Sequence, residues 1–303
     1  MIEFVLKLYT FRLDLHHYLQ LLLLITHKTP KPMTDIANHA YALDVSGYTR
    51  LPAQIERAEL EELRQSTNRA LEAARTVQHK QELTGGTEYY EAVRCLYCWG
   101  DACVRLLEHE AIHDLATLLM GQYCLWDMAA FAAQPTPATA TAATTSWHRD
   151  FSGLHWGAQT LGYLWFFVCL DDFTTDNGAT WIVPGSHRVD SRHQPVLNGA
   201  WTGDDFEQFP SRLQLCAAAG DILVLNPAIL HSSGRNATEQ PRRLINVGVS
   251  HASFRPLVDH WAIAGPTIQA QASERLSSFL GANRQPLATT WAVVPDGWQT
   301  AEA

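Results

Sequence analysis

The stretch Tyr163-Leu-Trp-Phe-Phe-Val-Cys-Leu170 is a short aromatic and β-branched run of the kind that forms a buried β-strand. Three similar runs follow it along the chain, at 179–183, 221–225 and 243–249. Turn signals rich in Gly, Pro, Asn and Asp lie between them, at 176–178, 184–186 and 219–221. Many short strands separated by turns predict an antiparallel β-sandwich or barrel in the second half of the chain.

The first half of the chain has helical periodicity instead. Apolar residues recur mostly at intervals of three and four from Ile55 to about Val77, and again over 101–120, where Gly121 suits a C-terminal stop. One short strand is expected within 42–51. The sequence therefore predicts a mainly β fold with helices packed on it, and one domain over residues 33–303.

The first 32 residues are interpreted as an N-terminal extension. The apolar run Leu19–Ile25 is far shorter than the ~20 residues of a membrane span. A proline-broken linker follows, and Met33 is then a plausible true start; the alternative is an amphipathic segment on a membrane surface. Without an export signal or a span, we expect a cytoplasmic protein.

Composition excludes several function classes. Of 303 residues, 47% are apolar and 17% charged, which suits a filled core, and the formal net charge of −9 disfavours a nucleic-acid partner. The six scattered cysteines are predicted to be reduced thiols. Cys95-Leu-Tyr-Cys98 has the spacing of a redox or zinc pair, but a structural role is favoured because no second pair follows.

Trp147-His148-Arg149-Asp150 carries the strongest chemical signal. On an extended strand, residues i and i+2 point to the same face, so His148 and Asp150 can bind one ion together. Two imidazoles and one carboxylate are typical of non-haem Fe(II) oxygenases. His231 ends the apolar run 221–230 and is the candidate for the second imidazole.

Arg242 follows His231 at a spacing that allows both side chains to reach one site. A turn over 232–241 leads to Arg242, and two antiparallel strands joined by that turn would bring Arg242 beside His231. A guanidinium fork suits the distal carboxylate of a dicarboxylic keto acid. Because strand residues alternate between faces, only one of Arg242 and Arg243 can face inward, and spacing alone leaves the choice open.

Residues 147–249 resemble the phytanoyl-CoA dioxygenase family of Fe(II)/2-oxoglutarate oxygenases. The resemblance rests on Trp147-His-Arg-Asp-Phe151, Asn177-Gly-Ala-Thr-Trp-Ile-Val-Pro-Gly-Ser-His-Arg188, His231-Ser-Ser-Gly-Arg-Asn236 and Pro241-Arg-Arg-Leu244. It extends more weakly from about residue 42 to 255. It implies a double-stranded β-helix core, which is the cupin-like jelly-roll of this superfamily.

The resemblance also implies roles for individual residues. His148, Asp150 and His231 fall on the iron ligands, Arg242 and Ser233 on positions that contact 2-oxoglutarate, and Phe167 on an aromatic position of that pocket. His187 is expected to shape its turn rather than to bind metal. The implied reaction uses Fe(II), 2-oxoglutarate and O2, with ascorbate as a supporting reductant, to hydroxylate a small molecule. The presence of Asp150 disfavours halogenation.

Two rival functions are kept. His109-Glu110-Ala-Ile-His113 is a formal HExxH motif and predicts, less strongly, a zinc-dependent hydrolase. The second rival is an inactive binding protein of the same fold. The substrate stays open among acyl-CoA, amino acids, alkaloids, polyketides and sugar derivatives.

Overall fold

Two antiparallel sheets form the core of the protein. The structure is a computed structural model that describes residues 35–76, 89–138, 147–150, 161–188 and 211–283. The larger sheet has the strand order β1-β7-β4-β9-β3-β2 and the smaller one the order β6-β5-β8. The strands of the larger sheet are β1 (Tyr48–Leu51), β2 (Tyr90–Arg94), β3 (Tyr123–Ala133), β4 (Tyr163–Cys169), β7 (Ile222–Leu225) and β9 (Arg242–His251). Those of the smaller sheet are β5 (Trp181–Val183), β6 (Leu213–Gln214) and β8 (Leu230–Ser232).

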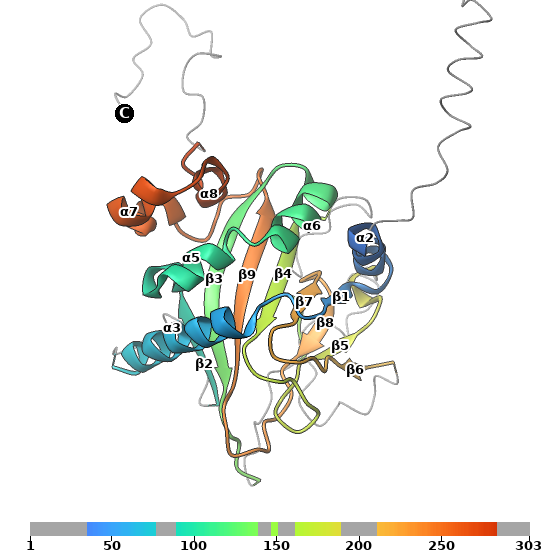
Figure 1. Ribbon diagram of the computed structural model, residues 1–303. Helices are drawn as coiled ribbons and strands as arrows, with labels where there is room; N and C mark the ends of the chain where they lie inside the picture. The colour runs from blue at the N-terminus through green and yellow to red at the C-terminus, as the bar shows by residue number, and fades with distance from the viewer. Residues whose placement is uncertain (1–34, 77–88, 139–146, 151–160, 189–210, 284–303) are drawn as a thin grey trace, which may run out of the picture. The chain divides into compact units, whose positions relative to one another are not determined.

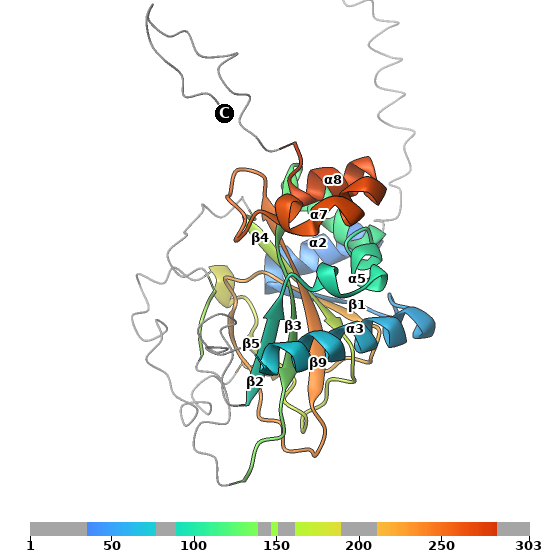
Figure 2. The ribbon, with the colours of Figure 1, turned by 90° about the vertical axis from the view of Figure 1, so that its left-hand side faces the viewer.

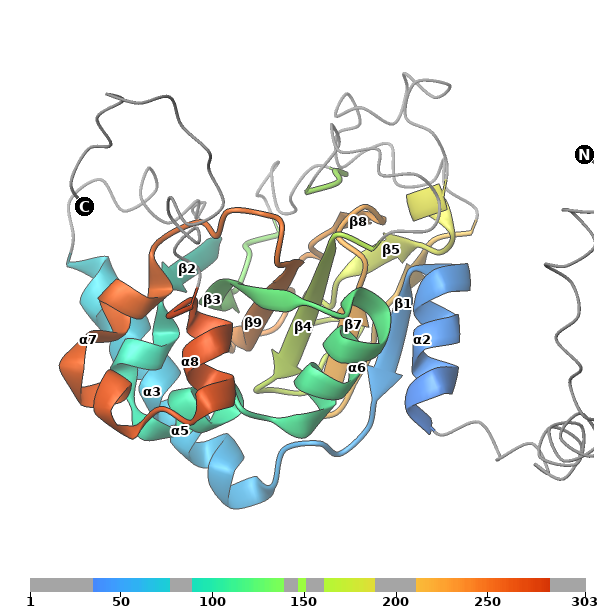
Figure 3. The ribbon, with the colours of Figure 1, turned by 90° about the horizontal axis from the view of Figure 1, so that it is seen from above.

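Helices cover one face of the larger sheet, and the smaller sheet lies on the other face (Figures 1 and 3). The helices are α2 (Asp35–Ser46), α3 (Arg57–Arg75), α5 (Asp101–Leu106), α6 (Glu110–Met120), α7 (His260–Gln271) and α8 (Glu274–Leu280), with 3-10 turns η2 (Leu96–Trp99) and η3 (Ser186–Arg188). This arrangement is the cupin-like jelly-roll that the family resemblance implies. Residues from His39 onward form one compact unit.

Strand alternation separates the two faces of the larger sheet. Trp165 and Cys169 of β4 and Leu244 of β9 belong to a buried cluster that also holds Ile182 and Ala179 from the smaller sheet side. This face of β4 and β9, toward the smaller sheet, is called the inner face below. Arg242 is the first residue of β9 and is nearly fully buried, with 1% of its surface exposed. It is two residues from Leu244, so both side chains point to the inner face.

The helix over 55–77 is confirmed as α3, whose buried side chains recur at helical spacing. The single helix expected over 101–120 is wrong, because the chain breaks into α5 and α6. The side chain of His109 accepts a hydrogen bond from the backbone N–H of Ala111, so His109 is the N-cap of a new helix rather than part of one.

Four elements differ from the sequence-based view that helices come first and strands later. Strands β2 and β3 precede residue 135, and helices α7 and α8 follow the last strand. The end of β3, Met128-Ala-Ala-Phe-Ala-Ala133, has high helix propensity, yet it pairs with β2 on one side and β9 on the other. Tertiary pairing therefore overrides local preference here.

One expectation falls outside the described residues, namely the N-terminal extension over 1–32. Among the described residues, every helix is too short or too polar to cross a bilayer.

Candidate metal centre

Three side chains from two segments converge at one point beside the smaller sheet. The possible ligand atoms of His148, Asp150 and His231 all lie within 4.8 Å of one another. Asp150 Oδ1 is 3.3 Å from His148 Nε2 and 3.7 Å from His231 Nε2. Ligands bound to one transition metal at about 2.0–2.2 Å have separations of this order.

Backbone hydrogen bonds hold the two ligand-bearing segments together. His148 and His231 form an antiparallel bridge in which each N–H donates to the other's carbonyl at 3.0 Å. The Asp150 N–H donates to the Pro227 carbonyl at 3.1 Å. Strand β8, which carries His231, therefore lies directly beside the segment of His148 and Asp150, and this pairing brings distant parts of the chain together.

The orientation of His231 is set by its other ring nitrogen. His231 Nδ1 donates to the Ile229 carbonyl at 2.9 Å, which leaves the lone pair of Nε2 directed at Asp150. Burial lowers the pKa of His231, although the charge of Asp150 raises it. The imidazole is thus neutral near pH 7, which is the form that binds a metal.

The second carboxylate oxygen of Asp150 is held by a tryptophan from the larger sheet. Trp165 Nε1 donates to Asp150 Oδ2 at 2.5 Å. Burial raises the pKa of Asp150, but His231, His148 and Trp165 outweigh it and bring that pKa down to about 2. Sequence reasoning missed this role of Trp165. The available signal was that Trp165 and Phe167 are two residues apart on one strand, so both side chains point to the inner face.

The Pro184-Gly-Ser-His187 turn supports both ligand segments. Ser186 Oγ accepts from the Leu230 N–H at 2.7 Å, and its carbonyl accepts from Arg149 Nη2 at 2.8 Å. These contacts lie next to His231 and between His148 and Asp150. The turn itself is anchored because His187 Nε2 donates to the Asp44 carbonyl at 3.0 Å. His187 thus stays away from the metal position, in agreement with its expected structural role.

Arg242 and Arg243 point to opposite faces of β9. Arg242 Nη2 donates to the Gly178 carbonyl at 2.7 Å, and its guanidinium carbon lies 4.2 Å from the centre of the Phe173 ring. Its Nε and Nη1 are buried and have no hydrogen-bond partner among the described residues. Two donors of the buried guanidinium are therefore available to an anion. Leaving them unpaired in a buried site would cost free energy, so the arrangement suits a bound anion.

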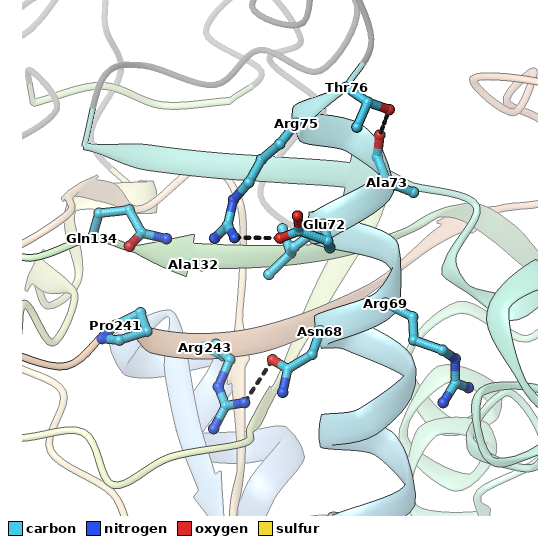
Figure 4. Close-up of a pocket in the computed structure, with 11 residues that line it drawn as sticks. Asn68, Arg69, Glu72, Ala73, Arg75, Thr76, Ala132, Gln134, Pro241 and Arg243 are labelled. Atoms are coloured by element: carbon cyan, nitrogen blue, oxygen red, sulfur yellow. Dashed lines mark hydrogen bonds and ion pairs between the residues drawn. The ribbon is translucent and has the colours of Figure 1, made fainter.

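Arg243 is engaged elsewhere. Its guanidinium makes paired contacts with Asp171, at 2.9 and 2.7 Å, and Nη1 donates to Asn68 at 2.8 Å. It lines a groove of about 620 Å³ between α3 and the outer, helix-covered face of the sheet (Figure 4). In that groove Arg75 is likewise paired, with Glu72 and Glu91. Only Arg242 of the adjacent pair thus keeps donors for a ligand.

The proposed hairpin between His231 and Arg242 is wrong in detail. His231 lies on β8 in the smaller sheet and Arg242 begins β9 in the larger one, so the intervening turn crosses between sheets. Ser233 follows β8 and is partly buried, and Phe167 packs partly buried against the core cluster. Their contacts to a co-substrate stay predictions.

The HExxH motif does not form a metal site. His109 caps α6, and its Nε2 contacts the Gln54 carbonyl at 3.2 Å. His113 is buried with both ring nitrogens occupied, by the Leu107 carbonyl at 2.8 Å and the Tyr123 hydroxyl at 2.9 Å. The two rings do not share a metal position, so the geometry does not support the zinc hydrolase alternative. Among the described residues, the group formed by His148, Asp150 and His231 is the one candidate metal site.

Fold and site together define a class of protein. A jelly-roll core that presents two imidazoles and a carboxylate fits a ferrous ion with open positions, and the buried fork of Arg242 fits a carboxylate of an organic acid. These are the features of the Fe(II)/2-oxoglutarate oxygenase class.

The chain belongs to the phytanoyl-CoA dioxygenase family: the family model described as Phytanoyl-CoA dioxygenase (PhyH) matches residues 43–244. Among curated proteins it is similar to Dioxygenase cdmD of Talaromyces verruculosus, with 31% identity over 35% of this chain and 31% of the relative. It is also similar to Dioxygenase sphC of Aspergillus fumigatus, with 28% identity over 40% of this chain and 30% of the relative. The matched stretch thus spans about a third of the length of these relatives.

Solved structures share the fold at low identity. The epimerase SnoN from nogalamycin biosynthesis, in complex with Fe3+, alpha ketoglutarate and nogalamycin RO, has a TM-score of 0.57 and 24% identity, covering 73% of this chain and 86% of SnoN. EctD from S. alaskensis, with 2-oxoglutarate and 5-hydroxyectoine, has a TM-score of 0.58 and 20% identity, covering 75% and 79% of the two chains. At these identities the likeness supports the jelly-roll fold.

Proposed function

We propose that this protein is an Fe(II)- and 2-oxoglutarate-dependent dioxygenase that hydroxylates an unactivated C–H bond of a small molecule. One oxygen atom of O2 enters the substrate as hydroxyl and the other enters succinate, while the 2-oxo acid loses CO2. The observation that carries the proposal is the convergence of His148, Asp150 and His231 within 4.8 Å.

The side chains of this protein would bind and orient the reactants. His148, Asp150 and His231 would hold the ion on one side and leave the opposite side to ligands, while Arg242 would bind the distal carboxylate of 2-oxoglutarate. When bound, the ferrous ion and 2-oxoglutarate supply the oxidising chemistry. Ser233 and Phe167 are proposed to complete the co-substrate pocket.

The proposal is tested first by binding. Fe(II) and 2-oxoglutarate added without oxygen are expected to produce a weak visible charge-transfer band with the wild-type protein. His148→Ala and His231→Ala should abolish the band, and with it the conversion of 2-oxoglutarate to succinate in air. A wild-type protein that binds neither would be the inactive relative kept as a rival.

A matched control separates loss of the ligand from loss of the fold. His109→Ala removes an imidazole that caps α6 outside the site, so it should leave the band and succinate formation unchanged. If the band survives in His148→Ala or His231→Ala, that residue is not a ligand. If His109→Ala alone abolishes activity, the HExxH motif regains its claim.

The cellular compartment and the domain organisation are also proposals. All six cysteines lie among the described residues and form no disulfide bond there, which supports a reducing compartment such as the cytoplasm. The family match over 43–244, and the strands and helices that continue to residue 280, support one oxygenase domain within 33–303.

A further inference from the structure

Tyr90 lies in line with Arg242 across three neighbouring strands. Tyr90 of β2 pairs with Ala133 of β3, and Ala133 in turn pairs with Arg242 of β9. Residues in register across a sheet point to the same face, so Tyr90 and Arg242 both face inward. Strands β2, β3 and β9 run side by side in Figure 2. Only the small side chain of Ala133 stands between Tyr90 and Arg242 in this row.

The ring of Tyr90 is held, while its hydroxyl is not. The ring stacks on Phe131 with 5.5 Å between centroids and 27° between planes. Tyr90 is partly buried, and no hydrogen bond joins its hydroxyl to any other described residue. A phenol fixed by stacking, with an available O–H in a partly closed site, is suited to donate to an anion.

The charges of Arg242 and Asp150 both act on the pKa of Tyr90. Burial raises the pKa of Tyr90, the positive charge of Arg242 lowers it and the negative charge of Asp150 raises it. The net pKa is raised, so the phenol keeps its proton at neutral pH. Tyr90 is thus close enough to feel both the guanidinium and the carboxylate of the metal centre.

We propose that Tyr90 is a binding residue for the distal carboxylate of the 2-oxo acid co-substrate, to which its hydroxyl donates beside Nε and Nη1 of Arg242. This assignment rests on the proposed function and adds to it. The carboxylate then receives three donors from two strands, β2 and β9. The same contact selects a dicarboxylic over a monocarboxylic 2-oxo acid.

The test is a binding comparison between two co-substrates. Wild type and Tyr90→Phe are loaded with Fe(II) without oxygen and titrated with 2-oxoglutarate and with 2-oxovalerate, which has a methyl group in place of the distal carboxylate. The charge-transfer band gives each Kd. Phenylalanine keeps the stacking on Phe131, so the fold is expected to survive. Loss of a hydrogen bond to a charged group should raise the Kd for 2-oxoglutarate roughly tenfold. The Kd for 2-oxovalerate should stay unchanged.

A second tyrosine serves as the matched control. Tyr97 bonds to His260 at 2.9 Å, away from Arg242, so Tyr97→Phe should leave both Kd values unchanged. Thermal stabilisation of the Mn(II)-loaded proteins by each acid provides a readout that is independent of the band. If Tyr90→Phe weakens both acids equally, or weakens neither, the assignment is overturned. A wild-type protein without any band overturns the proposed function as well.

Discussion

Replacing Arg242 with lysine is expected to weaken the binding of 2-oxoglutarate by one to two orders of magnitude. Arg242 Nη2 is already committed to the Gly178 carbonyl, and Nε and Nη1 are the two donors left for a carboxylate. Lysine keeps the positive charge but has no planar fork, so the paired contact is reduced to one hydrogen bond at best. A hydrogen bond to a charged group contributes about 1.5–3 kcal/mol. Its loss corresponds to roughly 10- to 150-fold in Kd.

The neighbouring residue is the matched control for this prediction. Arg243→Lys makes the same chemical change one position along β9, where the side chain binds Asp171 on the outer face. The anaerobic charge-transfer titration is run on both variants, and circular dichroism checks that each is folded. Arg242→Lys should shift the 2-oxoglutarate Kd and Arg243→Lys should not. Equal shifts in the two variants, or a larger one in Arg243→Lys, would refute the assignment of inward and outward faces.

Three further outcomes are expected. In Gly248→Ala the new Cβ would lie 2.7 Å from the Trp165 ring, so the indole must shift, at a cost of about 1–3 kcal/mol in urea unfolding. The shift should disturb the hydrogen bond from Trp165 to Asp150 and weaken Fe(II) binding. Unchanged metal affinity would argue against a positioning role for Trp165. Burial lowers the pKa of His113, so the unfolded chain binds protons more readily than the folded one. The stabilising contribution of His113 should therefore be full above about pH 6.5 and fall below it. His113→Gln should flatten the pH dependence of the free energy of unfolding between pH 7.5 and 5.5, and an unaltered dependence would contradict the reasoning. Chelation should abolish 2-oxoglutarate turnover, which added Fe(II) restores and Zn(II) does not; recovery with Zn(II) would contradict the iron assignment.

Local sequence patterns were sufficient to predict which residue types form the candidate site. The spacing of His148 and Asp150 implies a shared face, because a strand alternates with a period of two. His231, which follows the apolar run 221–230, adds the second imidazole of a ligand set that suits Fe(II). Arg242 adds a guanidinium for an anionic co-substrate. The helical periodicity of 57–75 and the aromatic run at 163–169 were likewise readable, because both bury one regular set of side chains.

Only the tertiary structure decided how these segments are placed. The alanine-rich end of β3 has helical preference, and its pairing with β2 and β9 depends on partners 30 to more than 100 residues away. The donation from Trp165 to Asp150 and the alignment of Tyr90 with Arg242 depend on the order of strands in the sheet. So does the inward position of Arg242, which spacing alone left open and the family resemblance favoured over Arg243. Sequence thus determined which groups were present and which faces they shared locally. Long-range pairing determined which of them meet, because hydrogen-bond register between distant strands leaves no mark in any one segment.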